Sequence, residues 1–153
     1  MTIQNINVLY VDDEINNLIG FKANFRRYYN VFTATSAKEA EEILITNEIH
    51  ILITDQRMPN TVGTELLESA IIKYPDQVRI LLSAHADSVT VIDAFQKGLL
   101  LRYVLKPYNP DELKGLIDSS YEVYTLNKIK NSLYKEWIKT NAEIALLKQK
   151  DKE

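Results

Sequence analysis

Three acidic residues directly follow short apolar runs in this sequence, and they suggest its chemistry. Asp12 and Asp13 come after Val8-Leu9-Tyr10-Val11, and Asp55 comes after the run that ends at Thr54. Carboxylates are costly beside a core because burial disfavours their charged form. Two of them about 5 Å apart repel by roughly 3 kcal/mol at an effective dielectric constant near 20. The three acids therefore predict a shared divalent cation.

The type of ligand indicates which ion and which reaction. Oxygen ligands without His or Cys suit Mg²⁺, which retains waters and accepts a substrate oxygen. Beside that ion, Asp55 is predicted to attack a phosphoryl group and form an acyl phosphate. Lys106 would then pair with one phosphoryl oxygen, and the Ser83 hydroxyl would donate to another. Gly63 lies in the loop after Asp55, where a larger residue would crowd the approach.

Short apolar runs alternate with helical patterns up to about residue 120. The predicted strands are Asn7–Val11, Val31–Thr35, Ile49–Thr54, Val78–Ser83 and Tyr103–Leu105. Predicted helices lie near 15–28, 37–47, 64–73 and 88–97, and a fifth begins at Pro110. Strands without polar alternation are typical of a parallel sheet covered on both faces. Five such units predict a doubly wound α/β domain, whose ligands bind beyond the carboxyl ends of the strands.

Local signals support the helix boundaries. Ser36 and Glu39 form a predicted capping box, in which Ser36 accepts from the Glu39 amide and Glu39 reaches back. Gly98 is expected in a left-handed cap after the fourth helix. Asn109 precedes Pro110 and two acids, which is typical of an N-cap, a first helical position and a favourable helix dipole.

The ordered motifs resemble the receiver domain of two-component response regulators. They are Asp12-Asp13, Asp55-x-x-Met58-Pro59 with Gly63, Ser83-Ala84 and Tyr103-x-x-Lys106-Pro107. Each motif is weak alone, but together they cover about residues 6–120 in the right order. The resemblance implies a flavodoxin-like five-stranded parallel sheet in the order 2-1-3-4-5, with residues 1–122 as the receiver and residues 123–153 as a helical extension.

The resemblance also implies a metal site and a phosphoacceptor. Asp55 matches the acceptor that a sensor histidine kinase or phosphotransfer protein phosphorylates. Asp13 and Asp55 match direct Mg²⁺ ligands, with the backbone carbonyl of Arg57 as a third. Asp12 matches the acid that acts through a metal-bound water. A protein of this kind is not an enzyme on other substrates, because it catalyses only its own phosphorylation and dephosphorylation.

Further positions match the family's switch residues. Ser83 resembles the hydroxyl that moves toward the phosphoryl group, and Tyr103 resembles the aromatic that turns inward behind it. Lys106 matches the phosphate-pairing lysine, and the family usually has a cis bond before the proline at position 107. Arg57 and His85 lie where the family tunes the lifetime of the phosphoryl group.

Simpler interpretations of these residues exist. Asp12 and Asp13 could merely cap the first helix, since strand-to-helix turns favour Asp. Ser83 alone is more often structural, Lys106 alone would be a surface lysine, and Tyr103 alone would be a packed aromatic. Their weight comes from occurring together.

The end of the chain has its own pattern. An apolar seam at spacings of three and four predicts that the fifth helix continues as a coiled coil. The seam residues are Val123, Leu126, Lys130, Leu133, Trp137, Thr140, Ile144 and Leu147. A parallel homodimer is the preferred hypothesis, with Lys130 and Thr140 setting the register. The alternative is a linker to an output domain.

Composition narrows the class of protein. Hydrophobic residues make up 46% and charged residues 25%, as in ordinary globular proteins. The absence of cysteine fits a reducing cytoplasm. A formal net charge of −3 gives no footprint for nucleic acid, and no membrane segment is expected.

Two other functions remain as alternatives to the phosphorylation-controlled switch. One is an aspartate-nucleophile phosphatase, which would need a general acid where this chain has Arg57. The other is a scaffold that dimerises through its C-terminal helix without being phosphorylated, which would leave the acidic cluster without a purpose.

Overall fold

The computed structural model describes residues 5–59, 61–84 and 89–152. Its main sheet has five parallel strands in the order β2-β1-β3-β6-β7. These are β1 (Asn7–Val11), β2 (Asn30–Ala34), β3 (Ile51–Thr54), β6 (Val78–Ser83) and β7 (Arg102–Leu105). The order of the main strands is the predicted 2-1-3-4-5, so the flavodoxin-like doubly wound fold is confirmed.

Helices cover both faces of the sheet, which explains the unbroken apolar strands. On one face, α1 (Ile15–Phe25) and α5 (Pro110–Lys150) pack through an apolar cluster that includes Phe21 and Ile117. On the other, α2 (Ala37–Thr46), α3 (Gly63–Lys73) and α4 (Val89–Gln96) pack through a second cluster. The strands β3 and β6 are buried along their whole length. Their alternate side chains supply both clusters, as a two-sided parallel sheet requires.

A short hairpin after β3 was not predicted. It pairs β4 (Arg57–Met58) with β5 (Thr61–Val62) in antiparallel fashion. Two-residue strands give too few positions for a periodic signal, so the sequence pattern could not reveal them. The hairpin carries the chain from Asp55 into Gly63 at the start of α3.

The predicted helix signals correspond to real contacts. Oγ of Ser36 accepts from the Glu39 amide at 3.2 Å, but the Glu39 carboxylate accepts from the Thr35 amide rather than from Ser36. Oδ1 of Asn109 accepts from the Asp111 amide at 2.9 Å. Gly98 has a φ of 73°, the left-handed conformation in which glycine avoids a Cβ clash.

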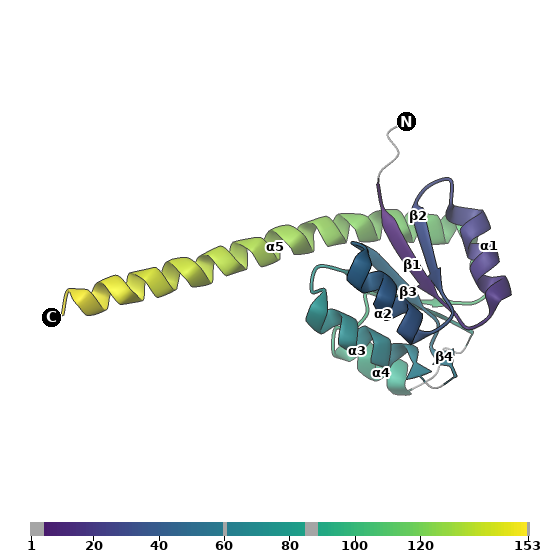
Figure 1. Cartoon of the computed structure of the whole chain (residues 1–153), viewed down its shortest axis with the longest axis horizontal. Helices are drawn as coiled ribbons and strands as arrows, with labels where there is room; N and C mark the ends of the chain where they lie inside the picture. Colours follow the sequence, from purple (N-terminus) through teal and green to yellow (C-terminus); the bar gives the residue numbers. More distant parts are fainter. Residues whose placement is uncertain (1–4, 60, 85–88, 153) are drawn as a thin grey trace.

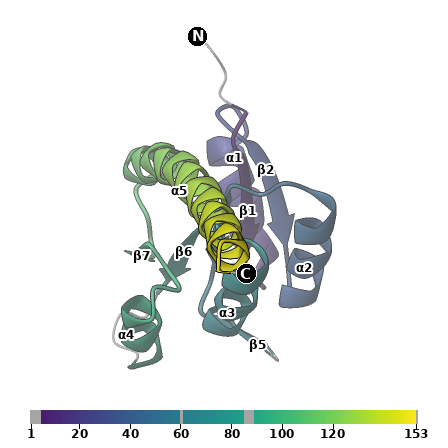
Figure 2. The same cartoon turned by 90° about the vertical axis from the view of Figure 1, so that its left-hand side faces the viewer.

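The helix α5 runs without interruption over 41 residues and leaves the domain (Figure 1). Its last buried residue is Tyr124, after which its side chains are exposed apart from the half-buried Asn127 and Asn131, which bond to Asp76. Figure 2 looks along the projecting part, with the C-terminus toward the viewer. Among the described helices, α5 included, none is both long enough and apolar enough to cross a membrane.

Candidate functional site

Three carboxylates converge at the carboxyl ends of β1 and β3. These strands are neighbours, with Val11 opposite Thr54, and the Asp55 amide donates to the Val11 carbonyl at 2.9 Å. One oxygen each of Asp12, Asp13 and Asp55 lies within 4.8 Å of the other two. Asp12 is buried, Asp55 is half-buried and Asp13 is exposed. The group therefore extends from the protein interior to solvent, which leaves access for an ion and a ligand.

Asp12 is held by donors from four directions. Its Oδ2 accepts from the Tyr10 hydroxyl at 2.6 Å, from Asn17 Nδ2 at 3.1 Å and from Lys106 Nζ at 2.6 Å. Its Oδ1 accepts from the Glu14 amide at 3.0 Å. Burial alone would raise the pKa of Asp12, but the bonds from Lys106, Tyr10 and the Glu14 amide lower it. Asp12 is therefore a permanent negative charge at neutral pH.

The helix-capping interpretation of Asp12 is partly right. Its bond to the Glu14 amide satisfies a backbone donor just before α1, where Glu14 itself makes no side-chain cap. However, helix capping does not require a lysine from the strand at the edge of the sheet. Lys106 follows β7 and contacts Asp12 across 94 positions of sequence. Asp12 therefore belongs to a site as well as to a helix start.

Lys106 also approaches Asp55. Its Nζ lies 3.5 Å from Asp55 Oδ2, while the Gln56 amide donates to Asp55 Oδ1 at 2.8 Å. Burial raises the pKa of Asp55, and the nearby Asp12 charge adds to this against the opposing effect of Lys106. Burial alone would lower the pKa of Lys106, but Asp12 and Asp55 raise it. The expected cis bond between Lys106 and Pro107 is present.

Gly63 is required by a close approach of two backbone segments. A Cβ at this position would lie 2.2 Å from the Asp55 carbonyl oxygen, a distance that real Cβ atoms do not reach. The Gly63 amide donates to the Gln56 carbonyl at 2.9 Å. The Gln56 side chain in turn accepts from the Thr64 amide at 3.1 Å and caps α3, where Val62 has no capping group. The loop after Asp55 is thus anchored tightly to a helix start.

The remaining predicted residues lie around this centre. Ser83 is buried at the end of β6, and its carbonyl accepts from the Lys106 amide at 2.9 Å. Tyr103 lies on β7 opposite Leu81, is half-buried, and packs against the apolar cluster under α3 and α4. Arg57 lies in the hairpin with an exposed side chain. His85 lies outside the described residues.

Sequence reasoning missed three contributors, namely Tyr10, Asn17 and Gln56. Tyr10 is an ordinary apolar strand residue in the sequence, and Asn17 is one of three asparagines in α1. Their roles depend on orientation around Asp12. The one available signal was the spacing of Asn17 from Asp12, which places it one turn into the following helix, above the end of the strand.

The donor set fits a hard divalent cation. Carboxylate oxygens from three residues converge, and one of the three faces solvent. Mg²⁺ prefers such oxygen ligands and completes its shell with water. Asp13 and Asp55 have room for direct ligation because neither carboxylate is fully buried, whereas Asp12 Oδ2 already accepts three hydrogen bonds.

A family model described as the response regulator receiver domain matches residues 8–118. The chain belongs to this family. The matched segment contains β1 to β7 and the start of α5, so it includes every residue of the site. The strand order of the structure is the one expected for this family.

Known proteins similar to the receiver come from several bacteria. The hydrogenase transcriptional regulatory protein HoxA of Cupriavidus necator is 32% identical over 119 residues, which are 78% of this chain and 25% of that protein. The crystal structure of an adenylate cyclase from Rhodopirellula baltica superposes with a TM-score of 0.80 at 29% identity, covering 86% of this chain and 98% of the other.

A third similar protein was crystallised with a ligand. The response regulator protein TrrA of Thermotoga maritima, in complex with Mg²⁺ and BeF, has a TM-score of 0.68 at 28% identity and covers 75% of this chain and 98% of the other. The receiver aligns with about a quarter of the length of curated relatives such as HoxA.

Proposed function

We propose that the chain is a phosphorylation-controlled switch in which Asp55 accepts a phosphoryl group in the presence of Mg²⁺. The convergence of Asp12, Asp13 and Asp55 within 4.8 Å, with Lys106 in contact with two of them, is the observation that carries the proposal. The donor is a sensor histidine kinase or phosphotransfer protein, as membership of the receiver family suggests. The phosphatase alternative is not favoured, because the guanidinium of Arg57 cannot serve as a general acid.

The reaction that we propose is a single displacement at phosphorus. A carboxylate oxygen of Asp55 forms a bond to phosphorus as the bond from phosphorus to the donor's imidazole nitrogen breaks, and the imidazole leaves with the electron pair. Lys106 Nζ, 3.5 Å from Asp55 Oδ2, is close enough to pair with a phosphoryl oxygen. The Ser83 hydroxyl is proposed to donate to another. Mg²⁺, when bound, supplies charge neutralisation for the phosphoryl oxygens.

The proposed ion ligands follow from the burial of each group. Asp13 and Asp55 would bind Mg²⁺ directly, together with the backbone carbonyl of Arg57 in the hairpin. Asp12 would act through a bound water, because its Oδ2 is saturated by Tyr10, Asn17 and Lys106. The chain would catalyse only its own phosphorylation and dephosphorylation.

The proposed output passes through α4, β7 and α5. Ser83 ends β6, and Tyr103 lies on the neighbouring strand β7, so a movement at the site would reach this surface through two adjacent strands. Large apolar side chains are exposed there, including Val89, Ile92 and Phe95 on α4. Such a surface suits an apolar partner whose binding depends on the state of the switch. The partner is proposed to be a protein, not a nucleic acid or a membrane.

Labelling by acetyl phosphate tests the phosphoacceptor. Wild-type protein with Mg²⁺ should gain the mass of one phosphoryl group, and Asp55→Asn should gain none. Asp93→Asn removes a carboxylate that is exposed on α4 and should label like the wild type. Equal labelling of wild type and Asp55→Asn would refute the assignment.

The C-terminal extension, residues 123–153, is proposed to form a parallel coiled-coil homodimer. Leu133, Trp137 and Leu147 of the seam are about 60% exposed and available to a second copy. Val123, at the start of the seam, instead packs against the apolar cluster of its own domain. The pairing surface would therefore begin beyond the receiver. Sedimentation at micromolar concentration would show a dimer, and a clean monomer would remove this proposal.

We also propose a cytoplasmic location, because the chain has no cysteine and its proposed kinase partner would phosphorylate it there. The receiver is assigned to residues 1–122, although α5 crosses this boundary without a break.

A further inference from the structure

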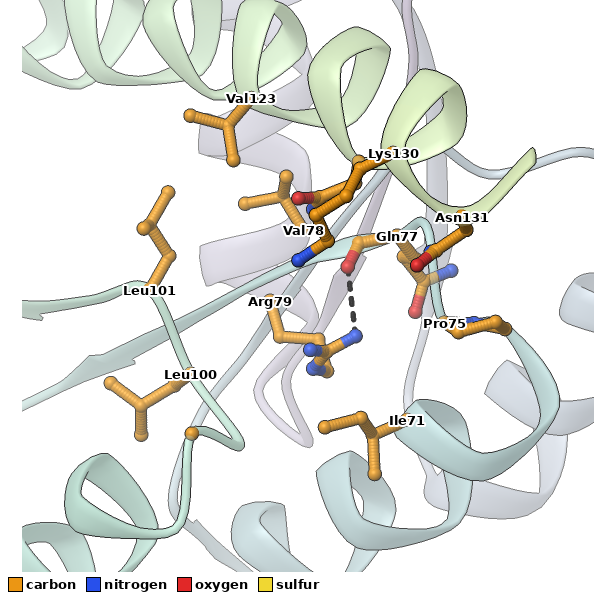
Figure 3. Close-up of a pocket in the computed structure, with 12 residues that line it drawn as sticks. Ile71, Pro75, Gln77, Val78, Arg79, Leu100, Leu101, Val123, Lys130 and Asn131 are labelled. Atoms are coloured by element: carbon orange, nitrogen blue, oxygen red, sulfur yellow. Dashed lines mark hydrogen bonds between the residues drawn. The ribbon is translucent and has the colours of Figure 1, made fainter. Parts of the chain in front are cut away.

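A pocket of about 410 Å³ lies at the amino ends of β6 and β7, under α5. It is formed by the end of α3, the loop between α4 and β7, the first residues of β6 and the segment of α5 around residues 123–131 (Figure 3). The phosphoacceptor site is at the opposite edge of the same sheet, where the strands end. A volume of this size is in the range of small-molecule sites. The functions proposed above do not use this pocket, although Val123 and Lys130 of its lining also belong to the predicted coiled-coil seam.

The floor of the pocket holds an arginine without an acidic partner. Arg79 is 9% exposed, and Figure 3 shows its guanidinium among the lining residues. Its Nε donates to the Leu99 carbonyl and one terminal nitrogen donates to the Gln77 carbonyl, both at 2.7 Å. No carboxylate among the residues described here lies within ion-pair distance of it. Since a guanidinium has five donors and remains charged at neutral pH, it has both charge and donors left for a ligand.

The rest of the lining is apolar on one side and polar on the other. Leu100 and Leu101 lie across from Asn131, and Val123 and Lys130 reach down from α5 (Figure 3). Lys130 adds a second positive charge. No acidic residue lines the pocket in the described part of the chain, and the neighbouring Asp76 carboxylate accepts a hydrogen bond from Asn131. A cleft lined by one sign of charge attracts ligands of the opposite sign.

One more buried atom lacks a partner among the described residues. Gln77 is 2% exposed, and its Nε2 donates to the Ile49 carbonyl at 3.1 Å. Its Oε1 accepts no hydrogen bond from the described residues. Leaving a buried acceptor unpaired is unfavourable. A ligand that carries an N–H group beside its anionic group would satisfy it once the Gln77 side chain turns toward the pocket.

We propose that this pocket binds a small amphipathic carboxylate with an N–H donor, of the kind represented by an N-acylated apolar amino acid. The carboxylate pairs with Arg79 and Lys130, the apolar side chain lies against Leu100 and Leu101, and the N–H group donates to Gln77. Because the ligand touches β6 and α5 together, it fixes the direction in which α5 leaves the domain.

Titration of the full chain with N-acetyl-L-leucine tests the proposal. In ¹⁵N NMR spectra recorded without Mg²⁺ or phosphorylation, we expect saturable shifts at Gln77, Leu100, Leu101 and the Arg79 Nε–H. N-acetyl-L-leucinamide, which lacks the charge, should bind roughly tenfold more weakly. Shifts confined to other regions, or equal binding of the two compounds, would overturn the proposal.

Two variants and a matched control test whether Lys130 and Arg79 bind the carboxylate of the ligand. Lys130→Glu should weaken binding roughly fivefold, whereas Lys128→Glu makes the same change two positions earlier, at a residue that does not line the pocket, and should leave binding unchanged. Arg79→Gln should remove the carboxylate preference, provided that its spectrum shows a folded protein. Sedimentation of Lys130→Glu separates an effect on dimerisation from an effect on the pocket. Equal losses in Lys130→Glu and Lys128→Glu would count against the proposal.

Discussion

The two ends of the central sheet handle buried charge differently. At the carboxyl ends of the strands, the buried Asp12 carboxylate has Lys106 and three neutral donors around it. At the amino ends, the buried Arg79 guanidinium donates to two backbone carbonyls and has no carboxylate partner among the residues that the structure describes. The first end places one lysine beside three carboxylates and so has negative charge left for a cation, whereas the second leaves a positive charge in a pocket.

Aromatic side chains pack together at the amino ends of the strands. His50 lies just before β3 and packs edge-on against Tyr121 and Tyr124 of α5, with ring centroids 5.3 and 4.7 Å away. The Tyr124 hydroxyl donates to Glu48 at 2.8 Å. This end therefore attaches α5 where the helix begins to project. The carboxylate cluster and the attachment of α5 therefore lie at opposite ends of one sheet.

The largest effect is expected from filling the space beside Asp55. Gly63→Ala would place a Cβ against a backbone oxygen, so the loop must move and stability should fall by about 3 kcal/mol. Gly115→Ala in α5 meets no atom within 4 Å and should stabilise the helix by about 1 kcal/mol. Urea denaturation measures both. Similar values for the two variants would mean that the carboxyl end is less tightly packed than the distances indicate.

Removing the cation from the carboxylate cluster should have the next largest effect. Lys106→Met leaves the buried Asp12 charge with neutral donors only, and we expect a loss of about 2 kcal/mol. Lys114→Met breaks an ion pair that is exposed to solvent on α5 and should cost about 0.5 kcal/mol. Thermal unfolding without Mg²⁺ compares them. A Lys106→Met protein as stable as Lys114→Met would show that Asp12 does not depend on this ion pair.

Mg²⁺ should stabilise the carboxyl end and leave the amino end unchanged. At about ten times its dissociation constant, the ion should add about 1.4 kcal/mol to the unfolding free energy. Asp13→Asn should remove most of this gain, and Asp111→Asn, an exposed acid at the start of α5, should retain it. The measurement is thermal unfolding with and without MgCl₂. Equal stabilisation of both variants would place the ion elsewhere.

The smallest effect on stability should come from lowering the pH, which protonates His50 at the amino ends of the strands. Burial lowers the pKa of His50 from its ordinary value of 6.5; Glu48 opposes this effect and Lys128 adds to it. The unfolded chain therefore binds this proton more readily, so the His50 contribution is complete above pH 6.5 and declines as the pH falls below it. His Nδ1 accepts from the Asn7 amide at 2.9 Å, and an asparagine oxygen can replace this acceptor.

Unfolding curves at pH 7 and pH 5 for wild type and His50→Asn measure this contribution. The wild type should lose more stability than the variant between the two values. The raised pKa of Asp55 acts in the opposite direction, but it is common to both proteins and cancels in the difference. An identical loss of stability in both proteins would show that protonation of His50 does not destabilise the folded state.

Much of the carboxyl end could be predicted because its residues follow strands. Asp12, Asp55, Ser83 and Lys106 each end an apolar run, and parallel strands bring their ends to one edge. Tyr10, Asn17 and Gln56 could not be predicted, since their roles depend on which way a side chain turns. The hairpin β4–β5 was not predicted because its strands have only two residues each. Arg79 looked like part of an ordinary strand, and only the three-dimensional structure shows that no described carboxylate pairs with it.

The sequence by itself determined the alternation of strands and helices, the acids at the strand ends and the long final helix, because these are local properties of the chain, whereas the strand order followed from the resemblance to the receiver family. Tertiary structure alone decided the contact of Lys106 with Asp12, the close approach at Gly63, and the pocket between β6 and α5. These depend on distances between segments far apart in the chain, and such distances are fixed only when both faces of the sheet are packed.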